Sequence, residues 1–302
     1  MKGLYAAAML TAVLLAGCSG TKTRPSRGSG PQNLGQATAA SRDDNSFHDD
    51  INQPQSSRYR DGKDSVPDGP APDISKLIEP VPKVEPRALY GNKSPYTVLG
   101  QTYRVLPSAR GYDERGIASF YGNKFHGYKT SSLETYDMYA FTAASKTLPL
   151  PSYARVTNLQ NGKSVIVRVN DRGPFHEDRL IDLSYAAAVK IGIWPKGTGL
   201  VEVRGIDPGQ PQPELSPPAV VTAGHPEIYL QVGAFSDADN AERVAERLRQ
   251  AGLGAVQVTD VDVNGRHVRR VRVGPLADVD SADRISARIE GMGLPRPQVA
   301  VD

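Results

Sequence analysis

The chain has 302 residues, and its 36 lysine and arginine residues exceed its 33 acidic residues by only three charges. This balance gives no electrostatic argument for nucleic-acid binding. The length accommodates two domains, and 29 glycines with 24 prolines indicate that linkers occupy a substantial share of it. A single cysteine, Cys18, excludes an intrachain disulfide, so folded parts depend on burial and hydrogen bonding.

The first residues have the pattern of a bacterial lipoprotein signal peptide. Lys2 precedes an apolar run over residues 4–15, which is too short for a comfortable membrane span. The run ends in Leu-Ala-Gly-Cys, which resembles a lipobox; the alternative is an ordinary signal peptide with an incidental cysteine. We therefore expect residues 1–17 to be removed and Cys18 to carry lipid. Ser19 follows in place of the usual aspartate retention signal, which by resemblance favours the outer membrane, facing the periplasm.

Residues 18–95 are predicted to form a long disordered linker. The stretch is rich in Ser, Gly, Asp, Asn, Arg and Pro and lacks sustained hydrophobic periodicity. As a flexible coil it would span on the order of 45–50 Å, enough to carry a domain from the membrane into the cell wall. A small folded domain is the less favoured alternative.

The region 96–206 is predicted to be mostly β. Its β-rich runs cover residues 96–106, 116–121, 154–159, 164–169 and 199–203. Asn161-Gly162 suits a tight hairpin turn, because both residues accept positive φ. Ser184 is expected to cap a short helix that stops at Gly192. Short strands with one small helix suit a compact barrel.

Several motifs in this region occur in an order shared with one family. They are Gly-Ile-Ala-Ser-Phe-Tyr-Gly at 116–122, Lys-Phe-His-Gly at 124–127, Glu-Thr-Tyr-Asp-Met at 134–138, Thr-Leu-Pro at 147–149 and Asn-Asp-Arg-Gly-Pro-Phe at 170–175. Together they resemble the rare lipoprotein A family of septal peptidoglycan lytic transglycosylases, over residues 96–204. The resemblance implies a double-psi β-barrel that cleaves peptide-free glycan endolytically and helps daughter cells separate. In that reaction the muramyl 6-hydroxyl attacks its own anomeric carbon and leaves a 1,6-anhydro end.

Two carboxylates are the candidate catalytic residues. Glycosidic cleavage needs a proton donor and stabilisation of positive charge, which carboxylates in different environments supply. Asp171 closes a strand before a Gly-Pro break, so it can be held rigidly; its alternative is a turn aspartate capping its own backbone. Arg172 beside it either lowers its pKa or points away. Glu134 lies in the family's Glu-x-Tyr-Asp segment. The alternative interpretation is that it is an ordinary exposed carboxylate on a loop.

The resemblance also implies a set of substrate-binding residues around these carboxylates. They are Tyr121, His126, Tyr136, Asp137, Ser145 and Arg172. The family usually carries histidine at position 145, and a serine cannot act as an imidazole acid or base. Residues 130–133 also replace a turn that usually contains glycine, so the Glu134 loop can sit differently. A non-catalytic, expansin-like wall binder is therefore the alternative function. No histidine pair stands at metal-ligand spacing, so we expect neither metal nor cofactor.

After a proline-rich linker at 207–226, residues 227–302 predict a second domain. Strands are expected at 228–233, 256–263, 268–273 and 298–301, with one helix starting at Ser236 and another at 280–291, a ferredoxin-like βαββαβ order. Tyr-Leu-Gln-Val-Gly-Ala-Phe at 229–235 and Val-Arg-Val-Gly-Pro-Leu at 271–276 resemble a SPOR domain, which implies binding to denuded septal glycan.

Alternation along these strands predicts one open face of the sheet that carries Tyr229, Gln231, Arg270 and Arg272. Such groups stack on sugar rings and bond hydroxyls, although a solvated face is the commonest use of them. An RNA-binding sheet has the same topology, but the lipobox argues against it. The expected partners are thus peptidoglycan strands and the membrane through Cys18, with no nucleic acid and with division proteins as further candidates.

Overall fold

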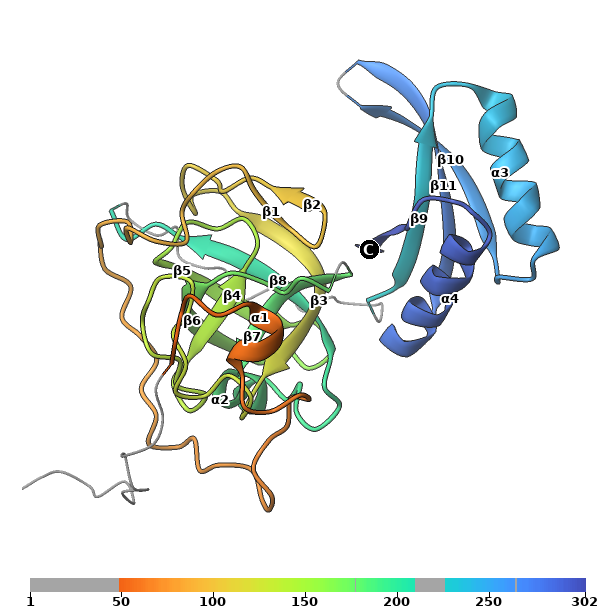
Figure 1. The fold of residues 1–302 in the computed structure, drawn as a ribbon. Helices are drawn as coiled ribbons and strands as arrows, with labels where there is room; N and C mark the ends of the chain where they lie inside the picture. Colours follow the sequence, from red (N-terminus) through yellow and green to blue (C-terminus); the bar gives the residue numbers. More distant parts are fainter. Residues whose placement is uncertain (1–48, 177, 210–225, 264) are drawn as a thin grey trace, which may run out of the picture. The chain divides into compact units, whose positions relative to one another are not determined.

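The computed structural model describes residues 49–176, 178–209, 226–263 and 265–302 (Figure 1). The predicted signal peptide, Cys18 and most of the proline-rich linker lie outside these ranges. In the part of the chain that is described, no helix combines the length and the hydropathy needed to cross a bilayer.

The first folded region is a closed six-stranded barrel. Its strands are β3 (Asp113–Tyr121), β4 (Thr142–Ser145), β5 (Ser152–Asn158), β6 (Ser164–Asp171), β7 (Arg179–Ser184) and β8 (Gly199–Ile206). They close in the order β3-β7-β4-β6-β5-β8. The β3–β7 and β4–β6 pairs are parallel, and the remaining pairs are antiparallel. The fold is the predicted double-psi β-barrel.

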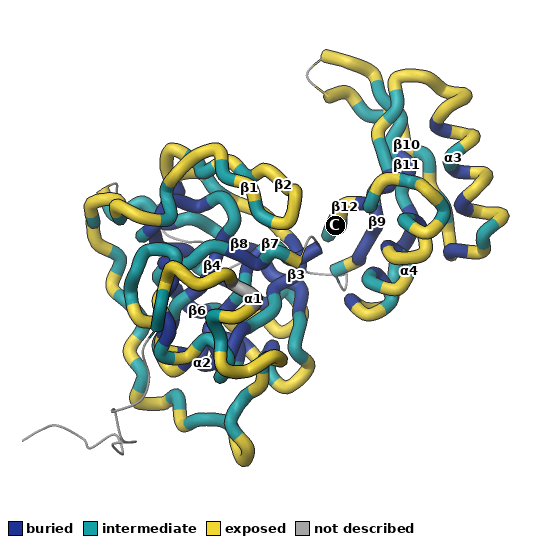
Figure 2. The backbone as a smooth tube through the Cα atoms, viewed as in Figure 1, coloured by how far each residue is buried: buried dark blue, intermediate teal, exposed yellow. Residues whose placement is uncertain are grey.

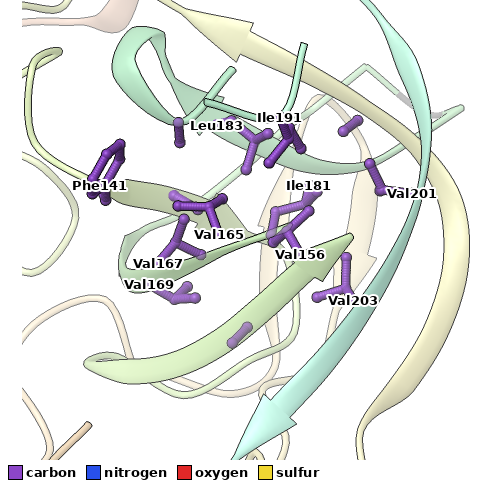
Figure 3. Close-up of a cluster of buried hydrophobic side chains, with 14 of the residues drawn as sticks. Phe141, Val156, Val165, Val167, Val169, Ile181, Leu183, Ile191, Val201 and Val203 are labelled. Atoms are coloured by element: carbon purple, nitrogen blue, oxygen red, sulfur yellow. The ribbon is translucent and has the colours of Figure 1, made fainter. Parts of the chain in front are cut away.

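Alternating aliphatic side chains fill the interior of the barrel. Val165, Val167 and Val169 of β6 point inward and meet Ile181 and Leu183 of β7 (Figure 3). Each of these side chains is almost completely buried, and full burial of such a side chain stabilises the fold by roughly 1.5–3 kcal/mol. Because strand side chains alternate, the residues between them face outward. Arg168 and Asn170 of β6 and Asp182 of β7 therefore lie on the outer side of the barrel wall.

The hairpin and the helix follow the sequence expectation. β5 and β6 pair in antiparallel register, and Gly162 in their turn has φ of +71°. Helix α2 (Tyr185–Lys190) begins at Ser184, whose hydroxyl accepts a hydrogen bond from the Ala187 nitrogen, and Gly192 ends it with φ of +73°. The short strands β4 and β7 were not expected.

Residues 49–95 differ from the predicted disordered linker. They run along the barrel and include a single-turn helix α1 (Gln55–Arg58), and they lead into a small hairpin of β1 (Tyr96–Val98) and β2 (Gln101–Tyr103). Burial along this segment is mostly slight (Figure 2). Its polar groups, however, bond barrel backbone: Glu79 accepts from the Ile166 nitrogen at 2.8 Å, and Asn92 donates to the Leu150 carbonyl at 2.6 Å. Hydrogen bonds thus hold a stretch whose composition supplies little apolar burial.

The second folded region has the predicted βαββαβ order. It consists of β9 (Ile228–Phe235), α3 (Ala238–Gln250), β10 (Val256–Val263), β11 (Arg266–Leu276), α4 (Val279–Gly291) and β12 (Gln298–Val301). The antiparallel sheet has the order β10-β11-β9-β12, and both helices lie on one of its faces (Figure 1). Helix α3 is capped by Asp237, which accepts from the Asn240 nitrogen at 2.7 Å, and not by Ser236. Serine and aspartate cap helices about equally well, but the carboxylate of Asp237 also interacts favourably with the positive end of the helix dipole.

Candidate active site

Asp171 is anchored at the end of β6 by a loop that is distant in sequence. Its Oδ1 atom accepts hydrogen bonds from the backbone nitrogen and the hydroxyl of Ser131, at 2.7 and 2.6 Å. The Arg172 nitrogen donates to the same oxygen at 2.7 Å. Asp171 is therefore not a turn residue that only caps its own backbone, because the 130–134 loop provides two of the three donors.

Burial raises the pKa of Asp171 above its ordinary value. The hydrogen bonds from Ser131 and from the Arg172 nitrogen oppose this rise, and so does the positive charge of Arg58. Burial thus favours the neutral form of the Asp171 carboxyl, whereas the donors around it favour the ionised form.

Glu134 lies on the same loop and reaches the same end of β6. Its Oε2 accepts from Nη1 of Arg168 at 2.5 Å and from Nδ2 of Asn170 at 2.9 Å. Burial raises the pKa of Glu134, but the hydrogen bonds from Arg168 and Asn170 outweigh it, and the net pKa is lowered. Glu134 is consequently held as a carboxylate.

The loop joins the two candidate catalytic residues. The Thr130 nitrogen bonds the Glu134 carbonyl at 2.8 Å, and Leu133 has φ of +67°, a conformation that usually calls for glycine. Ser131 donates hydrogen bonds to Asp171, and Glu134 accepts one from Asn170, the residue before Asp171. Both carboxyl groups therefore lie near the C-terminal end of β6. Their pKa values move in opposite directions, which is the arrangement expected of an acid and a charge stabiliser.

Arg172 points away from Asp171. Its guanidinium donates to the carbonyls of Gly91 at 2.6 Å, Ser145 at 3.0 Å and Leu148 at 2.5 Å. Burial lowers the pKa of Arg172 to about 10, which still leaves it charged near neutrality. The side chain thus links the segment at Gly91 to the segment 145–148, and the substrate-binding role implied for it remains a prediction.

Ser145 is buried and its hydroxyl serves the backbone. Oγ accepts from the nitrogens of Thr147 at 3.3 Å and Leu148 at 3.1 Å. The hydroxyl of Ser145 therefore shapes the Thr-Leu-Pro turn.

The aromatic and histidine candidates form two separate groups. Tyr121 and Tyr136 are buried and stacked, with ring centroids 4.1 Å apart, and the Tyr136 hydroxyl donates to the Tyr121 carbonyl at 2.7 Å. His126 and Asp137 are more exposed; His126 Nδ1 accepts from the Met138 nitrogen at 3.2 Å, and Asp137 accepts from the Tyr139 nitrogen at 2.9 Å. The tyrosines are therefore part of the packed interior, whereas the histidine and the aspartate are exposed to solvent.

Sequence reasoning missed several residues of the site, above all Asp182 on β7. Ile181 and Leu183 are core residues, so alternation alone places Asp182 on the outer side of the wall. Burial raises the pKa of Asp182 to about 7, with further contributions from the charges of Asp64 and Asp171. No sequence signal pairs Glu85 with Arg168, although Arg168 donates to both Glu85 oxygens, at 3.0 and 2.9 Å.

The predicted polar residues of the C-terminal sheet occupy neighbouring positions on its strands. Gln231 pairs with Arg272 in register, and the Arg272 guanidinium lies 5.7 Å from the Tyr229 ring centroid while bonding Asp302 at 2.7 Å. Arg270 lies two residues from Arg272 along β11. The group combines an aromatic ring, an amide and two guanidinium groups. Within the described ranges, no cluster of three or more His, Cys, Asp or Glu side chains is arranged to hold a metal ion.

Comparison with known proteins agrees with both folded regions. Residues 113–204 match the family model described as lytic transglycolase, and residues 224–299 match that of the SPOR domain. A solved SPOR domain of RlpA from Pseudomonas aeruginosa is 33% identical over 24% of this chain and 96% of its own, with a TM-score of 0.24.

Two curated relatives are named endolytic peptidoglycan transglycosylase RlpA. The one from Pseudomonas aeruginosa strain UCBPP-PA14 is 42% identical over 252 residues, which cover 66% of this chain and 73% of the relative. The one from Vibrio cholerae is 41% identical over 239 residues, covering 68% of this chain and 90% of the relative. The resemblance seen in the motifs is thereby confirmed, and this chain belongs to the RlpA, or rare lipoprotein A, family.

Proposed function

We propose that this chain is an endolytic lytic transglycosylase that cleaves peptide-free peptidoglycan glycan to 1,6-anhydromuramyl ends. The observation that carries the proposal is that one loop serves both carboxyl groups at the end of β6: Ser131 bonds Asp171, and Glu134 bonds Asn170. The pKa values of Asp171 and Glu134 are shifted in opposite directions. Family membership supports it, because the relatives are named for this activity.

The two carboxyl groups divide the chemistry between them. Asp171 donates its proton to the glycosidic oxygen as the bond to the anomeric carbon breaks. Glu134, held ionised by Arg168 and Asn170, stabilises the positive charge that develops on the sugar. The muramyl 6-hydroxyl then attacks the anomeric carbon, and its proton returns to Asp171. No water is consumed, and the products are an anhydro end and a free 4-hydroxyl.

The N-terminal cysteine and the C-terminal domain would hold the enzyme in the cell envelope. Lipid on Cys18 anchors the protein to the outer membrane, facing the periplasm, without a spanning helix. The SPOR sheet binds denuded glycan at the division septum through Tyr229, Gln231, Arg270 and Arg272, and this second contact raises the local substrate concentration. Cleavage there helps daughter cells separate, and division proteins are candidate partners.

Mass spectrometry of denuded sacculi tests the proposal. The soluble chain without residues 1–18 is expected to release anhydro ends, and Asp171→Asn is expected to abolish release while sparing binding. Asp113→Asn, at the exposed start of β3, is the matched control and keeps full activity. Reducing ends would indicate a hydrolase, and full activity in Asp171→Asn would remove Asp171 from the mechanism.

The buried Ser145 favours one second candidate, an expansin-like protein that binds the wall without cutting it. The position that carries histidine in the family here holds a hydroxyl bonded to backbone. Glycan that stays unchanged but still pulls down the protein would indicate this binder. Anhydro products that then appear in Ser145→His would show that serine at this position is what prevents cleavage.

A further inference from the structure

A short β-hairpin at residues 127–136 carries Ser131 and Glu134 near its tip. Its two arms are joined by backbone hydrogen bonds on either side of an antiparallel bridge between Lys129 and Thr135. In such a bridge the hydrogen bonds run between the neighbours of the two paired residues, so the nitrogen and the carbonyl of Lys129 point away from the opposite arm. The outer edge of the hairpin at Lys129 therefore needs hydrogen-bond partners from outside the hairpin.

An ion pair from the segment before the barrel supplies both partners. Oδ2 of Asp49 accepts from the Lys129 nitrogen at 2.6 Å, and Nη2 of Arg58 donates to the Lys129 carbonyl at 2.9 Å. The two side chains also bond each other twice, Nε to Oδ1 at 2.8 Å and Nη2 to Oδ2 at 2.6 Å. This bidentate geometry makes an arginine–carboxylate pair strong and directional. The Arg58–Asp49 pair thus binds both backbone groups of Lys129, as a neighbouring strand would.

The Arg58–Asp49 pair is covered and stays charged. The side chains of Arg58 and Asp49 are only 8% and 7% exposed. The hydrogen bond from Arg58 lowers the pKa of Asp49 and outweighs the opposing effect of burial. The next residue, Tyr59, packs edge-on against Phe125 and Tyr128, with ring centroids 4.8 and 5.0 Å apart, and so fixes the backbone that carries Arg58. Side chains with so little exposed surface act on a bound glycan through the hairpin and not by direct contact.

We propose that Arg58 and Asp49 are positioning residues for the two candidate catalytic carboxyl groups. They hold the hairpin at Lys129, two residues before the serine that donates to Asp171 and five residues before Glu134. Without this pair the hairpin is free to pivot, which lengthens the serine bonds to Asp171 and displaces Glu134. The consequence for catalysis rests on the proposed function, in which a displacement of about 1 Å can lower the rate about a hundredfold. Arg58 and Asp49 themselves exchange no atom with the substrate.

NMR of the protein without substrate tests the positioning role. Asp49→Asn leaves the positive charge of Arg58 in place but replaces one accepting oxygen with an NH2 group, so bonds to Arg58 or Lys129 are lost. The bonds from Ser131 favour the ionised form of Asp171. Their weakening is expected to raise the carboxyl titration midpoint of Asp171 by about half to one pH unit. The Ser131 amide is expected to exchange its hydrogen about tenfold faster.

Arg58→Lys is the second variant, because it keeps the charge but lacks the planar fork that bonds Asp49. It should change both readouts in the same direction, and it carries the test if amide spectra show that Asp49→Asn does not fold. Asp207→Asn breaks another arginine–aspartate pair, with Arg110 at 2.6 Å, and is the matched control that changes neither readout. An Asp171 midpoint that stays or falls in the folded variants, or a Ser131 amide that exchanges at the wild-type rate, would overturn the proposal. The other charged and titratable groups that interact with Asp171 stay in place in all these variants; they are Arg172, Asp182, Tyr121 and Tyr136.

Kinetics on denuded glycan separate positioning from substrate binding. Asp49→Asn is expected to lower kcat about ten- to a hundredfold, whereas KM changes by less than about twofold because the pair does not contact glycan. The alkaline limb of activity should move to higher pH together with the Asp171 midpoint, a shift that a merely structural role would not produce. If the NMR changes occur but the wild-type chain makes no anhydro product, the proposed function fails and the positioning role stands. If the wild-type chain makes anhydro product but the NMR readouts of Asp49→Asn match wild type, the positioning role fails and the proposed function stands.

Discussion

Ser131 donates two hydrogen bonds to one oxygen of Asp171, from its backbone nitrogen at 2.7 Å and its hydroxyl at 2.6 Å. Burial raises the pKa of Asp171, and these bonds hold the rise in check because they favour the ionised form. The acid strength of the proposed proton donor is therefore set by a loop 40 residues away in sequence.

Ser131→Ala should raise the pKa of Asp171 further, because it removes the hydroxyl donor and keeps the backbone one. Carboxyl-carbon NMR should show the higher midpoint, and the alkaline limb of activity should extend to higher pH as Asp171 retains its proton longer. Ser131→Thr keeps the hydroxyl and is the matched control. An alanine variant that titrates like wild type would show that the hydroxyl does not tune Asp171.

The pairing of Glu85 with Arg168 should make stability fall in acid. The hydrogen bond from Arg168 is the main reason that the pKa of Glu85 is lowered to about 2. A carboxyl whose pKa is depressed by folding stabilises the fold above its unfolded value, and the stability is lost as pH falls from about 4.5 towards 2. After allowance for solvent screening, the loss is on the order of 1–2 kcal/mol.

Urea unfolding at pH 7 and pH 3 checks this expectation. Glu85→Gln keeps the size of the side chain but cannot ionise, so its unfolding free energy should change less between the two pH values. Glu114→Gln, on an exposed position of β3, is the control. Equal acid sensitivity in Glu85→Gln and wild type would assign the loss to other carboxyl groups.

The sequence predicted the parts of the fold that leave a local pattern. The hairpin of β5 and β6 follows from alternating valines and an Asn-Gly turn, and the α2 helix from Ser184 and Gly192. Strand β4 leaves almost no signal, because four residues that include Ala143 and Ala144 form a strand only where the flanking strands pair with it. Tertiary pairing, not propensity, determines it.

The candidate site shows the same difference between residues with a local sequence signal and residues that depend on long-range contacts. Asp171 and Glu134 were predicted from motif resemblance, and alternation on β7 contained the signal for Asp182, which was not used. The sequence could not predict the partner of Arg168, because Glu85 lies 83 residues earlier in a stretch whose composition indicates a linker. Average composition does not reveal that a few carboxylates in such a stretch meet specific donors on the barrel.

Asp182 should make stability depend on pH in the opposite sense to Glu85. Its pKa is raised to about 7 in the folded protein, from roughly 3.9 in an unfolded chain. The folded state therefore binds more protons than the unfolded state between these values, and the unfolding free energy falls as pH rises from about 4 to 7, by a few kcal/mol at most. In Asp182→Asn this decline should be weaker, so the variant gains stability relative to wild type as pH increases. The measurement is the slope of the unfolding free energy, obtained from urea denaturation, against pH. A difference between variant and wild type that is the same at every pH reports only how the amide packs. Parallel slopes would contradict the raised pKa.

Gly122→Ala should release the segment before the barrel. A Cβ at Gly122 would lie 2.2 Å from the Ser65 carbonyl oxygen, a distance that no backbone contact tolerates. The neighbouring bond from the Asn123 nitrogen to the same oxygen, at 2.8 Å, and the contacts of Asp64 would be lost with it. Overpacking of this kind costs about 1–3 kcal/mol.

Trypsin reports the release, because Arg58, Arg60 and Lys63 lie in the affected segment. Cleavage at these three sites should accelerate about tenfold for every 1.4 kcal/mol by which the contact is weakened. Gly62→Ala has open space for its methyl group and is the matched control. If trypsin cuts both variants at the wild-type rate, the hydrogen bonds of Asp64 and Ser65 do not hold the segment in place. Faster cutting in Gly122→Ala alone would show that a stretch poor in apolar residues is fixed to the barrel by its polar contacts.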